Sequence, residues 1–200
     1  PFLIVRGKGG RERLVPLSEA ARRAMGAYLE AAVTQATSFH FETALRLAER
    51  GIELADAPAI TCDLRRLRGD VLRITGATDD SIAAFEAALE VAGDNKRQCL
   101  ALIGMAEGMR VADQHKKALE VLRDAEGAAA GDGLVHERVR IHYLRGNVYF
   151  PLGNIDGCLA EHEKALVFAR QVQGLVRAVP GPGEQLLGPG DALPIGHVRP

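Results

Sequence analysis

The sequence contains 200 residues, of which 47% are hydrophobic and 4% aromatic, and it has no tryptophan. Such a composition favours closely packed helices over a β-sandwich, whose strands are enriched in aromatic and β-branched residues. The formal net charge is −1, from 25 basic and 26 acidic residues, so no general attraction to nucleic acid or anionic membranes is expected. The sequence shows no signal peptide and no apolar run long enough to span a bilayer.

The first sixteen residues have the pattern of a short β-hairpin. Residues 2–5 and 13–15 are the two apolar stretches, and glycines at 7, 9 and 10 flank Lys8 in the turn between them. Glycine suits this turn because it adopts positive φ at little cost. Pro16 ends the second strand, and Ser18 is expected to cap a following helix.

Residues 40–173 are predicted to be helical, because apolar residues recur three and four positions apart throughout. Turn signals rich in glycine and acidic residues interrupt this pattern at 76–79, 93–95, 131–133 and 153–154. Residues 174–200 differ, since five of the nine prolines fall there, and we expect this tail to be disordered. The abrupt tail and the first residue, Pro1, together predict a fragment or a chimera of two genes.

Small residues repeat in one register through the helical region. They recur at steps of 37, 37 and 40 residues, at Ala44, Ser81, Ala118 and Cys158. Four positions later stand the residues expected to fill the space beside each helix crossing, Ala48, Phe85, Leu122 and His162. The preceding helices carry small residues at Gly69, Ala106 and Gly146. One helix pair cannot bury its own apolar face, so the register predicts stacked pairs.

This register resembles the tetratricopeptide repeat, with the best copy at residues 144–165 and the second best at 67–88. The resemblance implies an all-α, right-handed solenoid of antiparallel helix pairs over residues 32–173, between a segment 1–31 and the tail 174–200. The amino-acid sequence of residues 44–170 also resembles the repeat region of bacterial multidomain adenylate/guanylate cyclase–ATPase regulators. The sequence has no GxxxxGK[ST] motif, so no ATPase activity is expected.

The family resemblance implies that the first helix of each pair lines a concave groove, which holds a protein or peptide. The residues at the groove positions are Arg66, Asp70, Arg73, Ile103, Glu107, Arg110, Arg140, Tyr143, Asn147 and Phe150. Arginine and aromatic side chains suit interfaces because they combine buried area with hydrogen bonding. Each residue can equally belong to a solvated helix face, and Tyr143 and Phe150 can equally belong to the core between repeats.

Residues 3–31 resemble a different family, the tyrosine recombinases (phage integrase family), over their lysine hairpin and following helix. The resemblance implies that Lys8 matches the lysine that protonates the leaving 5′-oxygen, that Arg11 replaces a usual lysine, and that Arg13 matches a family arginine. His142 and Arg145 fit the family's His-x-x-Arg motif by spacing alone, inside the best repeat copy. The hairpin is therefore expected to make at most weak, salt-sensitive phosphate contacts.

No other motif supports catalysis or metal binding. Glu161-His162-Glu163 lacks the second histidine of a zinc-protease helix, and His162 is expected to be structural. Cys62, Cys99 and Cys158 are far apart, which predicts buried thiols in a reducing cytoplasm. We therefore predict a cytoplasmic interaction scaffold from a bacterial signalling protein, without enzyme activity or cofactor, that self-associates through its last helix. The alternative is an incomplete recombinase-type fragment that binds DNA.

Overall fold

The computed structural model describes residues 2–6, 12–16, 19–131 and 133–178, within which lie two strands and eight helices. Strands β1 (Phe2–Arg6) and β2 (Glu12–Pro16) pair antiparallel, with Phe2 opposite Pro16. The residues of the expected turn, including Lys8 and Arg11, lie outside the described residues, as do Ser18 and the tail from residue 179 onward.

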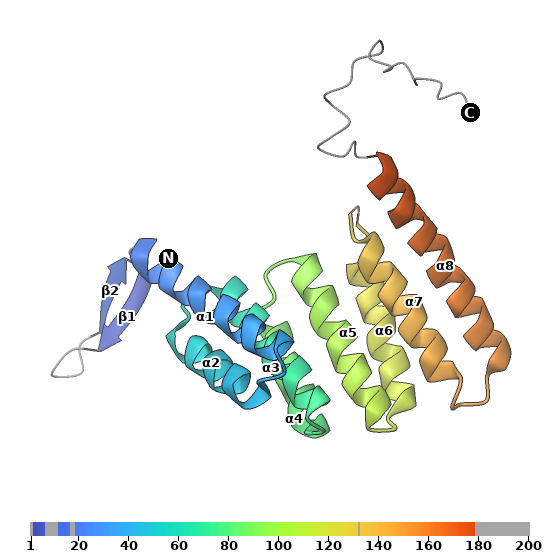
Figure 1. The fold of residues 1–200 in the computed structure, drawn as a ribbon, viewed down its shortest axis with the longest axis horizontal. Coiled ribbons are helices and arrows are strands. Elements are labelled where there is room, and N and C mark those ends of the chain that lie inside the picture. Colours follow the sequence, from blue (N-terminus) through green and yellow to red (C-terminus); the bar gives the residue numbers. More distant parts are fainter. Residues whose placement is uncertain (1, 7–11, 17–18, 132, 179–200) are drawn as a thin grey trace, which may run out of the picture.

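The eight described helices form consecutive hairpins that follow one another along the long axis of the molecule (Figure 1). They are α1 (Glu19–Thr37), α2 (Phe41–Leu54), α3 (Pro58–Ile74), α4 (Thr78–Glu90), α5 (Asn95–Val111), α6 (His115–Ala128), α7 (Val135–Tyr149) and α8 (Ile155–Ala178). This arrangement confirms the predicted helical-repeat solenoid. None of the described helices is both long and apolar enough to cross a membrane.

The array curves so that one row of helices lies on the inside. We call α1, α3, α5 and α7 the A helices, and α2, α4, α6 and α8 the B helices. Each A helix packs on the A helix of the next pair, whereas within the described residues the B helices of neighbouring pairs do not pack on one another. Helices that approach closely lie on the inner side of a curved stack, so the A helices line the concave face.

Helix α1 is the first A helix of the array. Ala32 is fully buried and shares a core cluster with Ala48 and Leu64. It precedes Gly69 by the same 37-residue step that separates later repeats. Helix α1 thus runs across the predicted boundary between residues 31 and 32. Helix α8 continues to Ala178, past the predicted start of the tail at residue 174, and the first proline beyond it is Pro180.

The predicted close crossings are present in all four pairs. The small residues of the B helices are 0%, 0%, 0% and 8% exposed, in the order Ala44, Ser81, Ala118 and Cys158. Ser81 Oγ donates a hydrogen bond of 2.8 Å to the carbonyl oxygen of Gly69. A Cβ atom on Gly69 would lie 2.9 Å from the Phe85 ring, and one on Gly146 would lie 2.5 Å from the His162 ring. Glycine is therefore required where a large B-helix side chain faces the A helix.

The turn inside each pair contains one residue in the left-handed region. These residues recur in the same register, with φ values of 61°, 87°, 56° and 72°, at Phe39, Gly76, Asp113 and Gly153. The sequence predicts the two turns with a glycine at this position, those at Gly76 and Gly153. The turns at Phe39 and Asp113 are not predicted by glycine. In these two turns the flanking helices force a residue other than glycine into positive φ.

We expect Gly76→Ala to lower the free energy of unfolding by about 1 kcal/mol, because a Cβ atom is unfavourable in the left-handed region. Gly76 has open space around the position of a Cβ atom, so backbone strain alone decides the effect. Urea unfolding followed by circular dichroism measures the change. Gly93→Ala is the control, since Gly93 lies in an interhelix turn, has open space and does not adopt positive φ. An equal loss in both variants would contradict the strain argument.

Candidate binding surfaces

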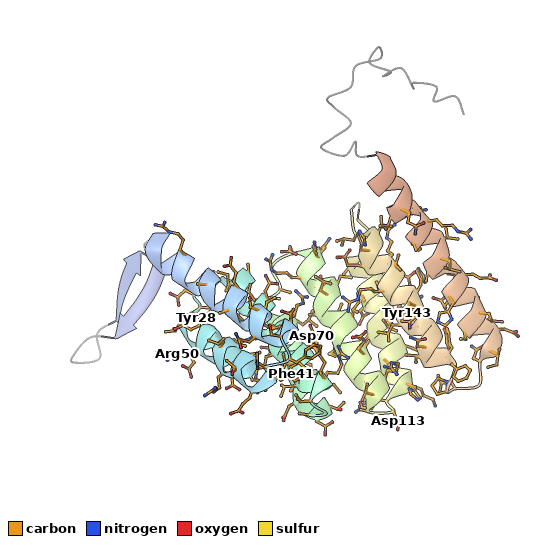
Figure 2. All side chains as sticks on the ribbon, viewed as in Figure 1. Tyr28, Phe41, Arg50, Asp70, Asp113 and Tyr143 are labelled. Atoms are coloured by element: carbon orange, nitrogen blue, oxygen red, sulfur yellow. The ribbon has the colours of Figure 1, made fainter. Side chains whose placement is uncertain are left out.

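The predicted groove residues lie on three A helices of the concave row. Arg66, Asp70 and Arg73 lie on α3, Glu107 and Arg110 on α5, and Arg140, Tyr143 and Asn147 on α7, which Phe150 follows directly. Figure 2 labels Asp70 and Tyr143 and shows that they come from different repeats. The structure thus brings the α3 and α5 residues together and places part of the α7 set elsewhere.

Ion pairs join α3 to α5 across the concave face. Arg73 Nη2 lies 3.5 Å from Asp70 Oδ1 on its own helix and 3.5 Å from Glu107 Oε2 on α5. Arg97 Nη2, from the first turn of α5, lies 2.9 Å from Asp63 Oδ2 on α3. Hydrogen bonds to Asp63 and Asp94 raise the pKa of Arg97 above its ordinary value. Most charged groups of this face are therefore already paired within the array.

Two groove arginines differ from these paired residues, the exposed Arg140 and the half-buried Arg110. Arg110 is the half-buried one of the two. Its guanidinium makes no hydrogen bond or ion pair with any residue that the structure describes, and its Nε atom is buried. Glu107, one turn earlier on the same helix, pairs with Arg73 instead. The Nε atoms of Arg66 and Arg73 are also buried and unpaired. An unsatisfied buried N–H group is costly, and a carboxylate is the acceptor that guanidinium groups bind best.

Two groove assignments need correction. Ile103 is 1% exposed and belongs to the main core cluster, because the next pair covers it. Tyr143 is 58% exposed and lines a groove between α7 and α8 rather than the charged part of the concave face. Phe150 is 66% exposed, so neither aromatic residue belongs to the core between the described repeats.

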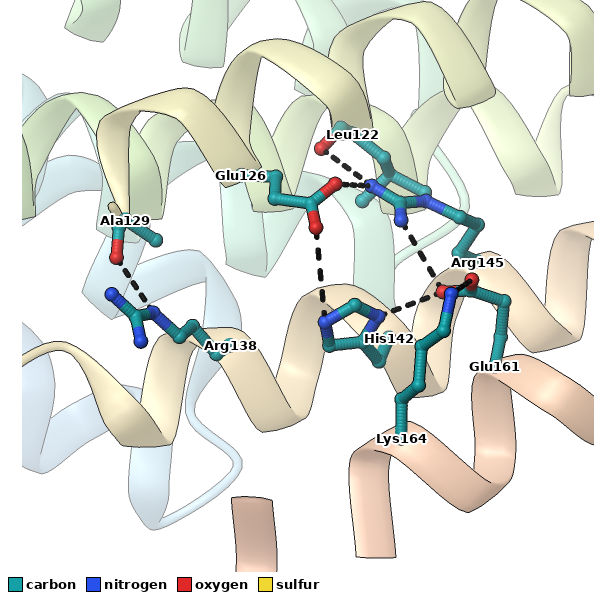
Figure 3. Close-up of polar contacts among 8 residues, drawn as sticks. All are labelled: Leu122, Glu126, Ala129, Arg138, His142, Arg145, Glu161 and Lys164. Carbon is teal, nitrogen blue, oxygen red and sulfur yellow. Dashed lines mark hydrogen bonds and ion pairs between the residues drawn. The ribbon is translucent and has the colours of Figure 1, made fainter. Parts of the chain in front are cut away.

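His142 and Arg145 form part of a buried charge network that joins α6, α7 and α8 (Figure 3). His142 is 4% exposed, and its Nδ1 atom lies 2.7 Å from Glu161 Oε2. Arg145 pairs with Glu126 at 2.7 Å and with Glu161 at 3.3 Å, and Lys164 pairs with Glu161 at 2.7 Å. The His-x-x-Arg spacing therefore has a structural explanation inside the repeat.

Glu161 is the centre of this network. Burial raises the pKa of Glu161, but hydrogen bonds from His142 and Lys164 and the charge of Arg145 outweigh it, so the pKa lies below its ordinary value. One repeat earlier, Leu102 and Val121 occupy the positions of His142 and Glu161 and are 4% and 9% exposed. The repeat motif alone does not predict this replacement, but a comparison of His142 and Glu161 with the residues 40 positions earlier reveals it.

Three side chains of α7 and α8 make contacts like those of a nucleophile, a base and an orienting group. They are Cys158, His162 and Asn147, in that order. Cys158 Sγ lies 3.8 Å from His162 Nδ1, and His162 Nε2 lies 3.3 Å from Asn147 Oδ1. However, the thiol lies at a tight helix crossing, and the Cys158 amide donates to the carbonyl oxygen of Asn154, just before α8. That amide is therefore not available to stabilise an oxyanion, which acyl transfer requires. His162 is half-buried against Gly146, as expected for a structural side chain.

The other two thiols are buried, as the sequence predicts. Burial raises the pKa of Cys62, and it raises the pKa of Cys99 to about 11. Such thiols are poor nucleophiles and metal ligands at neutral pH. Within the residues that the structure describes, no three His, Cys, Asp or Glu side chains gather in a way that could hold a metal ion.

Comparison with curated proteins finds a likeness only for a short segment. A stretch of 30 residues is 77% identical to tyrosine recombinase XerD of Rhizobium meliloti (strain 1021), and it makes up 15% of this chain. The match covers 10% of the recombinase, so this chain spans about a tenth of that protein's length. No protein-family model matches the sequence.

Solved structures resemble the helical array over most of its length. Aspartyl phosphate phosphatase F from Bacillus subtilis has a TM-score of 0.71 and 11% identity, covering 81% of this chain but only 44% of the phosphatase. One structure of MamA has a TM-score of 0.59 and 15% identity, covering 78% of this chain and 88% of the MamA chain. A second has a TM-score of 0.56 and 18% identity, covering 77% of this chain and 76% of the MamA chain. Identities this low show the fold alone, and they give no support to the predicted cyclase resemblance. With the four-pair register, they show that this chain has a tetratricopeptide-like helical-repeat fold.

Proposed function

We propose that the chain is a protein-interaction scaffold whose concave row of A helices holds a segment of a partner protein. Within that row, Arg110 binds an acidic group of the partner. The observation that carries this proposal is the half-buried guanidinium of Arg110, which lacks any partner within the described residues while Arg66, Arg73 and Arg97 are paired. A carboxylate that reaches Arg110 would accept a charge-assisted hydrogen bond from the terminal N–H groups of its guanidinium.

We expect peptides selected for binding to the full chain to be enriched in Asp and Glu and to depend on Arg110. The probe is a displayed library of random peptides, followed by isothermal titration of the selected sequences. Arg110→Gln should weaken their binding about tenfold, since a hydrogen bond to a charged group contributes roughly 1.5–3 kcal/mol. Binding should also weaken as the salt concentration rises.

Arg123→Gln is the matched control for this experiment. Arg123 is an exposed residue of the B helix α6, away from the concave row, so the same chemical change should leave peptide affinity unchanged. Selected peptides without acidic enrichment, or equal losses in both variants, would contradict the assignment of Arg110. Membership of a larger bacterial signalling protein and a cytoplasmic location belong to the same proposal and rest on the sequence alone.

A second candidate function is DNA contact by the N-terminal segment, which the 30-residue likeness to a tyrosine recombinase favours. In this hypothesis the phosphates are contacted by Lys8, Arg11 and Arg13. Of these residues, Arg13 lies on strand β2. A gel-shift assay at low and moderate salt tests it with the Lys8→Ala/Arg11→Ala double variant. A shift lost in this variant and kept in Lys116→Ala/Lys117→Ala, on exposed positions of α6, supports DNA contact. Absence of a wild-type shift rejects it.

A further inference from the structure

The groove between α7 and α8 is apolar and uncovered. It has a volume of about 330 Å³ and is lined by Val139, Tyr143, His162, Ala165, Leu166 and Ala169. Tyr143 and Leu166 are each 58% exposed. In the described part of the chain, α7 is the only element that packs on α8. An exposed apolar groove of this kind indicates an interaction surface.

The same surface is covered in the two preceding pairs. The position of Val139 is occupied by Cys99 one repeat earlier and by Cys62 two repeats earlier. The position of Ala165 is occupied by Ala125 and Ala88 in the same two repeats. All four earlier residues are fully buried. In each of those pairs the covering element is the A helix of the next pair, α5 over α3 and α4, and α7 over α5 and α6. The array itself therefore shows what kind of element fits the groove, namely an α-helix.

The covering helices share one pattern of contact residues, at positions i, i+3 and i+7. The three sets, on α3, α5 and α7, are Leu64, Leu67 and Val71; Ala101, Gly104 and Gly108; and Ile141, Leu144 and Val148. Residues of all three sets pack with the pair before: Leu64 and Leu67 with Ala48, Ala101 with Ala88, and Ile141, Leu144 and Val148 with Leu122. For example, a Cβ atom on Gly104 would overlap the Phe85 ring, and one on Gly108 would lie 2.9 Å from Ile82 Cγ1.

The sizes of the facing residues are complementary. Phe85 is the largest B-helix residue at its position, and it faces Gly104 of α5. Leu122 is smaller and shares its core cluster with Leu144 and Val148 of α7. His162 stands at the same position in α8 and leaves the groove beside it open. The occupant of this last groove should therefore carry aliphatic side chains, as α7 does, rather than the small residues of α5.

The described helix α1 does not provide such a surface in a second copy. At the three contact positions α1 carries Ala27, Glu30 and Thr34, all exposed. Head-to-tail stacking would bury the Glu30 carboxylate in the apolar groove, which is costly. Residues 179–200 lie outside the described residues, and their prolines at 180, 182, 189, 194 and 200 predict no helix as long as the A helices.

We propose that the α7–α8 groove binds an amphipathic α-helix of a partner protein, with aliphatic residues at i, i+3 and i+7. This helix lies where the A helix of a further pair would lie. It contacts Tyr143, His162 and Leu166 through its aliphatic face. The groove does not include Arg110, so the proposal does not depend on the function proposed above.

The test uses the full chain and a fluorescent peptide with the sequence of residues 135–149, the α7 pattern. A hydrocarbon staple between positions 136 and 140, which are exposed in the chain, keeps this short helix folded. Fluorescence anisotropy should show saturable binding that Leu166→Glu weakens at least tenfold. Val167→Glu is the matched control, because Val167 is 52% exposed on α8 but does not line the groove. A peptide of residues 95–111, the α5 pattern, should bind about tenfold more weakly.

Three results would overturn the proposal. The first is an absence of saturable binding by the α7 peptide up to about 1 mM. The second is equal binding by Leu166→Glu and wild type. The third is a concentration-dependent dimer of the chain that Leu166→Glu disperses in light scattering, because a second copy and not a partner helix would then cover the groove.

Discussion

Phe85→Ala is expected to lower the free energy of unfolding by about 4 kcal/mol. Phe85 is 1% exposed and is the largest of the fully buried side chains. Its ring lies against Gly69 of its own pair and Gly104 of the next pair, so its loss leaves a cavity that two glycines cannot fill. Urea unfolding followed by circular dichroism measures the change. Because α4 contacts both α3 and α5, the transition should also become broader as the two halves of the array uncouple.

Phe39→Ala is the matched control for this prediction. Phe39 is 81% exposed in the first turn between helices, and the same substitution there should cost less than about 0.5 kcal/mol. A loss at Phe85 no larger than the loss at Phe39 would mean that the contact between Phe85 and the two glycines does not hold the second and third pairs together.

Glu161→Ala is expected to cost about 3 kcal/mol, because it leaves the buried side chains of Arg145 and His142 without their shared acceptor. Glu161 has a side-chain exposure of 8% and Arg145 of 11%. Arg145 keeps Glu126 as a partner in the variant, so the loss should lie at the low end for a broken buried ion pair. Glu163→Ala, at an exposed position of the same helix, should change stability by less than about 0.5 kcal/mol.

The effect of Glu161 depends on pH in a defined direction. Its pKa is lowered in the folded chain, so its stabilising contribution is present above the unfolded pKa and is lost as pH falls through the folded pKa. The stability difference between wild type and Glu161→Ala should therefore be constant near neutral pH and shrink below about pH 4. A difference that stays the same down to pH 3 would show that packing, and not charge, is what the variant removes.

The helical register could be predicted because it depends on residue size. Small residues at Ala44, Ser81 and Ala118 mark helix crossings wherever the chain repeats, and all three are fully buried as expected. The first A helix was missed, although Ala32 obeys the same step, because residues 3–31 also resemble a recombinase segment. Sequence likeness to another family does not decide how a helix packs in this chain.

The charged contacts could not be predicted from the sequence. Arg97 and Asp63 meet across two A helices, and the pairing depends on how far neighbouring pairs rotate relative to one another. The family position of Ile103 predicts a groove residue, but the rotation places it under the next pair, where it is buried. Arg110 was predicted as a groove residue, whereas its lack of an internal partner is visible only in the structure.

Hydrogen exchange of the full chain, followed by mass spectrometry, tests most directly that one array extends from α1 to α8. We expect slow exchange in the amides of residues 24–37, comparable to those of residues 41–54, because Ala32 of α1 is packed in the core with Ala48 of α2. Exchange should be fast in the turns at Phe39, Gly76 and Asp113. Fast exchange throughout residues 24–37, with slow exchange beginning only at α2, would contradict the account.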